Sequence, residues 1–489
     1  MESVTSAIGP MLESGLGNLA AYLAAHVLLC LLPAFFIAGA MAALIPQESV
    51  TRFLGRNAPK AVSYPAAAAA GSLLAVCSCT IVPLFAGIYR KGAGLGPAIT
   101  FLFFAPAANI LALVYTGGVL GADLAGARFL LSLAFGIGIG LIMALVFRDD
   151  DAAHEQPASG PFGGGGPTGM SRAALLFLLL WIALLLAGTL KLAFLTNAAF
   201  GITVPSGDAL AWQAALDGLV PHDAGRGEEG VTVQGAALIA LLVAIGACAW
   251  KGLEDIQEGL NGWARASLAL IAATLLVASL AVNATPAGLA IAFTGKFFAV
   301  GLCLALIFAT ARRALPRDDV LAWLWESWRF VKQIFPLLVA GVFVVGMLRV
   351  LIRPEWIEAL AGTNSVVGNF AGVAFGVVMY FPTLVEVPIA KMFLDLGMHR
   401  GPLLAYLMAD PELSLQSILI ISAIIGRRMT AAYVGLVALF SAVAGLAYGA
   451  WVDGAQPLLI ALSVGAFIAL LALGVSRAGA ARHATTQGT

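Results

Sequence analysis

Two stretches of the sequence decide the fold. They are residues 77–109, "CSCTIVPLFAGIYRKGAGLGPAITFLFFAPAAN", and residues 382–414, "PTLVEVPIAKMFLDLGMHRGPLLAYLMADPELS". When the two regions are aligned at an offset of 305 residues, glycines and prolines coincide at Gly71 and Gly376, Pro83 and Pro388, Gly92 and Gly397, Gly96-Pro97 and Gly401-Pro402, Pro106 and Pro411, and Gly121 and Gly426. Glycine and proline constrain the backbone more than the surface. The sequence therefore predicts that one backbone shape occurs twice.

The composition of the chain is that of a membrane protein. Of its 489 residues, 61% are hydrophobic and only 11% are charged, against about 25% charged in an average soluble domain. A helix needs about 20 apolar residues to cross the hydrocarbon core. Segments of this kind lie at roughly 18–46, 127–147, 172–195, 233–250, 266–282, 287–311, 331–352, 429–450 and 456–476. Regions 61–121 and 366–426 are apolar but broken by Pro, Gly and polar residues.

The positions of the basic residues indicate the topology. Arginine and lysine gather at 47–60, 148–172, 251–265, 312–330, 427–428 and in the C-terminal tail, and such clusters mark the cytoplasmic side. If each broken region crosses the membrane once, the two halves enter it from opposite sides. We therefore predict an all-α polytopic membrane protein with about ten net crossings and two inverted-topology repeats, each holding a proline- and glycine-broken helical hairpin, as in many secondary transporters.

This scheme divides the chain into four parts. We expect a first repeat half at 1–148, a flexible cytoplasmic linker at 149–171, connecting transmembrane helices at 172–330 with an acidic external loop at 196–232, and a second repeat half at 331–489.

Polar side chains interrupt both broken regions. Carboxylates at membrane depth are costly and mark ion or proton pathways, and proline frees backbone carbonyls that can face a cavity. We predict that the substrate-binding residues are Cys77, Ser78, Cys79, Thr80, Pro83, Asn109, Thr383, Glu386 and Gln416. Proton or ion coupling is assigned to Glu386, Asp410 and Glu412. The alternatives are helix packing for the cysteines, an interfacial position for Glu386, and a solvent-exposed turn for Asp410-Pro411-Glu412.

Charged residues also occur where each broken segment turns. They are Arg90 and Lys91 in the first half, and Lys391, Asp395 and Arg400 in the second. They are either interfacial anchors or gates that pair and unpair as the two halves move.

The two thiols of Cys77 and Cys79 suit soft, thiophilic species such as cuprous ion, zinc or trivalent arsenic and antimony compounds. They are accordingly candidate metal ligands. The five cysteines show no disulfide framework. A redox role for the pair is the alternative.

Other classes of function find little support in the sequence. No GxxxxGK[ST] or HExxH motif occurs, so we expect neither an enzyme nor a bound cofactor. The formal net charge is zero, which gives no global field for nucleic acid. The expected partners are the lipid bilayer and a small-molecule or ion substrate, and a homo-oligomer is left open.

The motifs resemble a known family. The pattern "CSCTIVPLFAGIYRKGAGLGPA" in the first half and "GVVMYFPTLVEVPIAKMFLDLGMHRGPLLAYLMADPELSL" in the second are similar to those of the predicted permeases that include the YraQ-type proteins and the ArsP organoarsenical efflux permeases. The resemblance implies a multi-pass permease of a bacterial-type cytoplasmic (inner) membrane with two related halves. For the ArsP branch it implies efflux of trivalent organoarsenicals.

The function predicted from residues and resemblance together is secondary export of a small thiophilic metal or metalloid species, such as trivalent (organo)arsenicals, coupled to protons. One alternative is a permease for uptake or exchange of a small ion or sulfur-containing metabolite. An alternative of another class is a membrane redox or accessory protein that uses Cys77 and Cys79.

Overall fold

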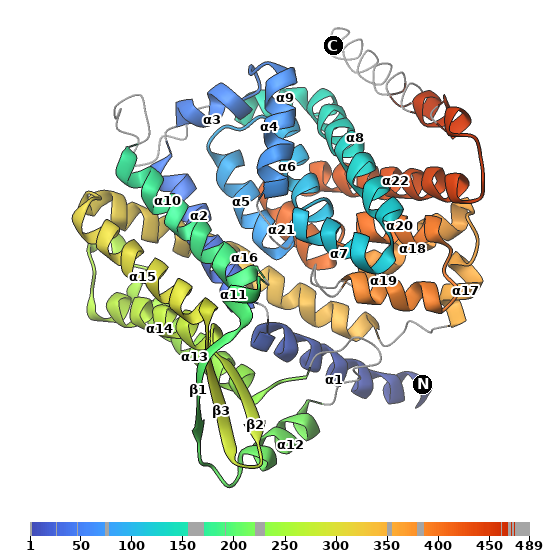
Figure 1. Ribbon diagram of the computed structural model, residues 1–489. Helices are drawn as coiled ribbons and strands as arrows, with labels where there is room; N and C mark the ends of the chain where they lie inside the picture. The colour runs from blue at the N-terminus through green and yellow to red at the C-terminus, as the bar shows by residue number, and fades with distance from the viewer. Residues whose placement is uncertain are drawn as a thin grey trace. The chain divides into compact units, whose positions relative to one another are not determined.

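The computed structural model describes residues 2–25, 27–45, 47–73, 78–154, 171–190, 192–220, 230–349, 355–378, 386–460, 462–467, 471 and 474 (Figure 1). The chain forms two compact units, and neither is contiguous in sequence. Unit 1 comprises Met1–Ser49, Cys79–Lys91 and Ser159–Leu351, and unit 2 comprises Val50–Ser78, Gly92–Ala158 and Ile352–Thr489. Each unit combines segments from both expected halves, and the half boundaries at 148 and 331 stay a prediction.

Unit 1 consists of helices and one small sheet. Its elements are α1 (Glu2–Ala25), α2 (Val27–Leu44), α5 (Ser78–Arg90), α10 (Arg172–Thr189), α11 (Ala193–Thr196), β1 (Ala198–Val204), α12 (Ala209–Leu219), α13 (Val233–Gly252), η2 (Ile256–Glu258), α14 (Gly262–Ala278), β2 (Ala281–Thr285), β3 (Gly288–Thr294), α15 (Gly295–Arg313) and α16 (Arg317–Arg349). Helix α3 (Gln47–Leu54) spans the boundary between the units.

Unit 2 is helical throughout its described residues. Its elements are α4 (Lys60–Leu73), α6 (Leu95–Ala107), α7 (Ile110–Leu120), α8 (Ala122–Val146), α9 (Arg148–His154), α17 (Glu355–Ala361), α18 (Val366–Val378), α19 (Glu386–Asp395), α20 (Arg400–Ala409), α21 (Leu415–Ile425) and α22 (Arg427–Val452).

The lengths of these helices confirm a polytopic α-helical membrane protein. Among the described residues, six helices are long and apolar enough to cross a membrane, and the count rises to seven if the bent pair of α6 and α7 is taken as one span. Shorter apolar helices add to these, including Pro457–Phe467. The prediction of about ten crossings stays a prediction. Helix α16 begins at Arg317, well before the expected span at 331–352, so the basic segment is itself helical.

The long helix α16 packs against both α1 and α2 in unit 1. Ser14 of α1 donates a hydrogen bond to the Gly346 carbonyl at 2.9 Å, and Asn18 donates to the Val342 carbonyl at 2.9 Å. These bonds from side chains to backbone oxygens hold α1 against α16.

A three-stranded antiparallel sheet, in the order β1-β3-β2, was not expected from the sequence. Figure 1 shows it beside α12. The expected span at 287–311 was wrong at its start, because its first residues form β3 and the helix begins only at Gly295. The β-branched and aromatic residues of β3 favour a strand. Gly288, with φ of 123°, follows the turn from β2.

Unit 2 contains the same helical arrangement twice. Adding 305 to the bounds of α7 (110–120) gives 415–425, the bounds of α21, and adding it to those of α8 (122–146) gives 427–451, within one residue of α22. Helices α4, α6 and α8 pack together, as do α18, α20 and α22. The four glycines at 92, 121, 397 and 426, two equivalent pairs, all have positive φ. The predicted recurrence of one backbone shape is thus present.

The two copies have opposite directions, as the contacts between α8 and α22 show. Asp123, at the start of α8, accepts a hydrogen bond of 2.8 Å from Tyr448, near the end of α22. Phe135 and Phe440 meet midway with ring centroids 4.9 Å apart. The Arg428 guanidinium, at the start of α22, lies 5.7 Å from the Phe147 ring, just after α8.

Phe135 and Phe440 are equivalent residues at the offset of 305, so the pseudo-twofold axis passes between them. If α8 and α22 were parallel, every residue of α8 would meet its own equivalent in α22. Instead the start of each helix lies beside the end of the other. The axis is therefore perpendicular to both helices. Because α8 and α22 are both long enough to span a membrane, this axis lies in the membrane plane, which is the geometry of an inverted-topology repeat.

Candidate functional site

The first break in unit 2 lies between α6 and α7, whose axes differ by 41°. Pro106 stands in the last turn of α6 and lacks an N–H. Asn109 then begins α7 as its N-cap, and its side-chain oxygen accepts a bond of 2.8 Å from the Ala112 N–H. Its amide group donates to the Pro106 carbonyl at 3.4 Å. Asn109 thus supports both sides of the break.

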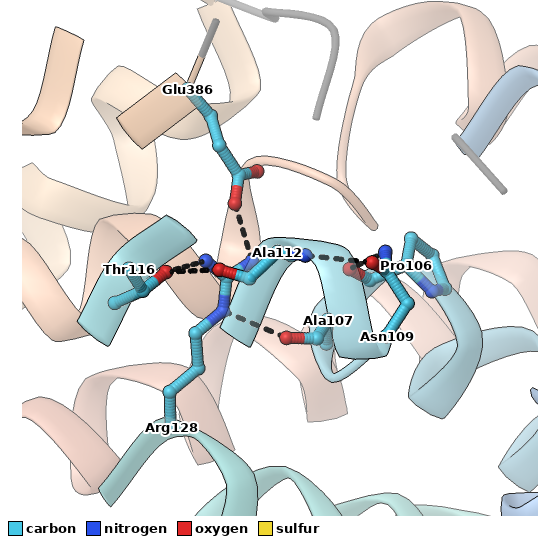
Figure 2. Close-up of polar contacts among 7 residues, drawn as sticks. All are labelled: Pro106, Ala107, Asn109, Ala112, Thr116, Arg128 and Glu386. Atoms are coloured by element: carbon cyan, nitrogen blue, oxygen red, sulfur yellow. Dashed lines mark hydrogen bonds and ion pairs between the residues drawn. The ribbon is translucent and has the colours of Figure 1, made fainter. Parts of the chain in front are cut away.

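Arg128 of α8 enters the same break from the side (Figure 2). Its Nε donates to the Ala107 carbonyl at 2.7 Å, which satisfies one of the backbone oxygens freed where α6 ends. Its Nη1 donates to the Thr116 hydroxyl at 3.1 Å, and that hydroxyl donates to the Ala112 carbonyl at 2.6 Å. The guanidinium therefore connects α6 and α7, and its side chain is fully buried.

Glu386, the first residue of α19, completes this cluster. Its Oε1 lies 2.5 Å from Arg128 Nη2, and neither side chain has exposed surface. Glu386 Oε2 has no hydrogen-bond partner among the described residues. Helix α19 also packs against α7 and α20, so the ion pair joins the two repeats within unit 2. Burial overturns the alternative that placed Glu386 in water at an interface.

The second break lies between α20 and α21 and spans residues 410–414. The N–H groups of Glu412 and Leu413 both donate to the Ala409 carbonyl, at 3.1 and 2.8 Å. Ser414 is the N-cap of α21, so it occupies the place that Asn109 has in the first repeat. Asp410 and Glu412 are buried, at 0% and 2% exposed. These acids consequently do not form the solvent-exposed turn considered above.

Tyr433 of α22 approaches this second break as Arg128 approaches the first. Its hydroxyl donates to Glu412 Oε2 at 2.7 Å. Tyr433 is equivalent to Arg128 at the offset of 305, and Glu412 is equivalent to Ala107. A side chain at one position of the following helix therefore holds each break, but one is a cation and the other is a neutral phenol.

Further buried polar groups surround the second break. Gln416 is 1% exposed, and neither its side-chain oxygen nor its nitrogen has a partner among the described residues. The same holds for Glu412 Oε1. Buried polar atoms of this kind are rare and call for an explanation. The Glu412 carboxyl oxygen can take up a proton, and the Gln416 amide can bind an ion or a polar solute.

The first-half thiol motif falls largely outside this description. Cys77 and Thr383 lie outside the described residues, and Ser78 and Cys79 begin α5, where nothing is described of their side chains. Thr80 and Pro83 lie in buried turns of α5. This helix belongs to unit 1, apart from Ser78, whereas the other described candidates, Asn109, Glu386, Asp410, Glu412 and Gln416, belong to unit 2. Among the described residues no cluster of three His, Cys, Asp or Glu side chains could hold a metal ion.

The charged residues at the turns have separate surroundings. Arg90 contacts the Gln333 side chain and lies 4.5 Å from the Phe330 ring, both in unit 1. Lys91 is partly buried. In unit 2, Lys391 and Asp395 form an exposed pair one helical turn apart. Arg400 instead pairs with Asp123 at 2.9 Å and joins the two repeats.

Several residues of the cluster were missed in the sequence. Arg128, Thr116 and Tyr433 were not among the candidates. A signal existed for Arg128, because it is the one charged residue between Asp123 and Arg148 in an apolar span, and such residues are functional by default. Tyr433 then follows from the offset of 305.

The comparisons with known proteins agree with this architecture. A family model described as a predicted permease, ArsP_1, matches residues 14–450. The chain belongs to this family of predicted permeases. The UPF0718 protein MJ0584 of Methanocaldococcus jannaschii is 32% identical to the permease over 428 residues, which is 88% of this chain and 93% of the relative. No solved structure matches the permease.

Membership confirms the resemblance seen in the two motifs. Together with the apolar helices it makes the permease a multi-pass membrane transporter, whose surroundings are the lipid bilayer and whose substrate is a small molecule. The Arg128–Glu386 pair at the first break and the Tyr433–Glu412 pair at the second are its candidate transport site.

Proposed function

We propose that the permease is a secondary transporter that exports a small solute across a bacterial-type cytoplasmic membrane and binds it at the two helix breaks. The observation that carries this proposal is the presence of buried carboxylates at two broken helices related by an in-plane pseudo-twofold axis. Transporters with inverted repeats bind substrate near the midplane on discontinuous helices. Charged side chains at that depth are expensive and serve ion pathways.

The substrate class proposed is a thiophilic metal or metalloid species, with trivalent organoarsenicals foremost. Cys77 and Cys79 support it, because thiolates select soft ions, and so does the resemblance to the ArsP branch. In this proposal the substrate-binding residues are Cys77, Ser78, Cys79, Thr80, Pro83, Asn109, Thr383, Glu386 and Gln416.

The coupling proposed is to protons, with Glu386, Asp410 and Glu412 as candidate carriers. A proton gradient can drive export when a carboxyl group is protonated on one side of the membrane and deprotonated on the other. The burial of all three carboxylates supports this role, since a buried carboxyl group responds strongly to its surroundings.

A growth assay tests substrate and direction together. A sensitive bacterial host expressing the full chain is challenged with methylarsenite, antimonite, copper and zinc. We expect at least tenfold higher tolerance to trivalent methylarsenite, and loss of that protection in Cys77→Ser/Cys79→Ser. The matched control is Cys248→Ser/Cys303→Ser, which removes two thiols of unit 1 outside the motif and should protect like the native chain.

The outcomes of this assay separate the candidate functions. Protection that survives Cys77→Ser/Cys79→Ser would discard thiol ligation of the substrate. Greater sensitivity of the host on expression would favour uptake. A redox role requires Cys77 and Cys79 to cycle between thiol and disulfide during turnover, which thiol labelling detects.

A further inference from the structure

We propose that Glu412 is the residue that carries the coupling proton, and that Arg128 holds Glu386 as a fixed negative charge that takes no part in proton transfer. This inference rests on the proposed function as a proton-coupled permease. It assigns different roles to two of the candidate acids. The sequence gives no reason to separate Glu386 from Glu412, because both are carboxylates beside a proline of a broken region.

The surroundings of Glu386 favour its charged form. The Arg128 guanidinium lies 2.5 Å away, and both side chains are fully buried. Protonation of Glu386 would leave the arginine as an uncompensated buried cation, which is strongly unfavourable. Arg128 cannot easily turn to another partner, since it also donates to the Ala107 carbonyl and the Thr116 hydroxyl. Glu386 is therefore locked into a neutral pair.

The surroundings of Glu412 favour its neutral form. Its side chain has one described partner, the Tyr433 hydroxyl of α22, and a phenol brings no positive charge. Among the described residues no lysine, arginine or histidine forms an ion pair with Glu412. A lone buried carboxylate is costly, so Glu412 is best accommodated with a proton bound.

The contrast between Glu386 and Glu412 follows from a difference between equivalent positions of the two repeats. Position 128 in the first repeat and position 433 in the second hold equivalent helix breaks, yet only the first supplies a cation. The first break is neutral because it holds an ion pair. The second is neutral because it holds a protonated acid and a phenol. The first break cannot take up a proton without leaving Arg128 as a buried, uncompensated cation, whereas the second is neutral when its acid is protonated.

The proton balance of the proposed step is simple. When water reaches Glu412 from the side of low proton concentration, the carboxyl group gives its proton to a water molecule and becomes a carboxylate. When water reaches it from the other side, hydronium returns one proton. Each cycle moves one proton, and the Arg128–Glu386 pair keeps its charges throughout.

Infrared difference spectroscopy of the full chain in liposomes tests the assignment without any substrate. A change of bulk pH should alter a C=O band of a buried, protonated carboxyl group. We expect Glu412→Gln to abolish this band. The double variant R128Q/E386Q, which removes both charges together, should retain it. Tyr433→Phe leaves the acid in place but removes its hydrogen-bond donor, so the band should shift in frequency.

Controls and contrary outcomes are defined in the same measurement. Glu254→Gln changes an exposed acid of unit 1 and should leave the band unchanged. The inference is wrong if the band persists in Glu412→Gln. It is also wrong if the band disappears in R128Q/E386Q or in Asp410→Asn. A band whose frequency is unchanged in Tyr433→Phe would contradict it as well. The last variant keeps the test valid even where Glu412→Gln fails to fold.

Failure of the proposed function gives a different result. If the native chain drives no methylarsenite uptake into everted vesicles but the band behaves as expected, the substrate is wrong and the proton site stands. If methylarsenite export depends on the pH gradient and is lost equally in Glu386→Gln and Glu412→Gln while no carboxyl band titrates, the permease stands and the division of labour is wrong.

Discussion

The two helix breaks of unit 2 have the same backbone shape but different polar side chains. At α6/α7 an arginine satisfies a free carbonyl and neutralises a carboxylate from α19. At α20/α21 the equivalent residue is a tyrosine that binds an acid within the break itself. Duplication has preserved the caps, the prolines and the positive-φ glycines, which define the shape. The charged groups that occupy this shape differ between the copies.

This difference teaches that symmetry of the scaffold does not imply symmetry of the site. A transporter needs a backbone that can present the same cavity to both sides, and an inverted repeat provides it. It also needs binding and coupling groups that respond differently. An ion pair at one break and an acid without a cationic partner at the other meet both needs.

The largest effect should come from breaking the ion pair at the first break. Arg128→Leu leaves Glu386 as an unpaired buried charge, and we expect the free energy of unfolding to fall by about 3–5 kcal/mol. The double variant R128L/E386L, with no buried charge, should recover most of this loss. Tryptophan fluorescence during denaturant unfolding in detergent measures both.

The equivalent position in the second repeat is the matched control. Tyr433→Phe removes a single hydrogen bond, so its loss should be only about 1 kcal/mol. Equal losses of unfolding free energy in Arg128→Leu and Tyr433→Phe would show that the charge at position 128 contributes nothing to stability. The proposed contrast between the two breaks would then be wrong.

The close approach of helices at the two breaks gives the next largest effect. A Cβ at Gly71 would lie 3.1 Å from the Ala105 nitrogen, and one at Gly376 would lie 2.9 Å from the Asp410 nitrogen. These glycines are equivalent, and so are their neighbours. Both contacts involve backbone atoms that cannot turn aside, so overpacking at the tighter site should lower the free energy of unfolding by about 1–3 kcal/mol in Gly376→Ala.

Gly71→Ala should destabilise less, because its contact is longer and alanine favours the helix by up to about 1 kcal/mol over glycine. Thermal unfolding of the purified variants side by side checks the order. A greater loss in Gly71→Ala would mean that the first break is the more tightly packed of the two.

Much of this comparison could be predicted from the sequence, and the reason is local. Glycine and proline act on their own backbone, so the offset of 305 residues revealed the breaks and the repeat directly. The acids at 386, 410 and 412 were conspicuous because charge is rare in apolar segments. All three proved to be buried.

The partners of these acids could not be predicted in the same way. Arg128 and Glu386 are far apart in the chain, and their pairing depends on how α8, α7 and α19 pack. The interleaving of the two units and the sheet of unit 1 have the same cause, since both depend on contacts between distant segments. The roles of Cys77, Cys79 and Thr383 stay predictions from the motifs.

The N-caps at the two breaks should contribute equally and moderately. Asn109→Ala and Ser414→Ala each remove the side-chain acceptor at the start of a half-helix, α7 or α21, and we expect each to lose about 1 kcal/mol of unfolding free energy. Asn109→Asp keeps an acceptor and should lose less. If neither alanine variant changes the thermal midpoint, the breaks are held by tertiary contacts alone.

The smallest effect should come from an exposed ion pair, which sets the scale for the buried one. Glu254 accepts hydrogen bonds from Lys332 at 2.7 Å and Trp328 at 2.9 Å, and these bonds hold the pKa of its carboxyl group below the usual value. Since the folded pKa is lowered, the pair stabilises the protein above the unfolded pKa of about 4.3, and that stabilisation is lost as the pH falls through the folded value.

At neutral pH, Glu254→Gln should therefore reduce the free energy of unfolding by less than about 0.5 kcal/mol, because solvent screens the pair. The difference from the native chain should shrink as the pH is lowered from 7 towards 3.5, and high salt at pH 7 should also reduce it. Arg128→Leu should keep its full penalty in high salt, because ions do not reach a buried pair. A Glu254→Gln loss that rivals that of Arg128→Leu, or that is insensitive to salt, would show that burial is not what separates the two pairs.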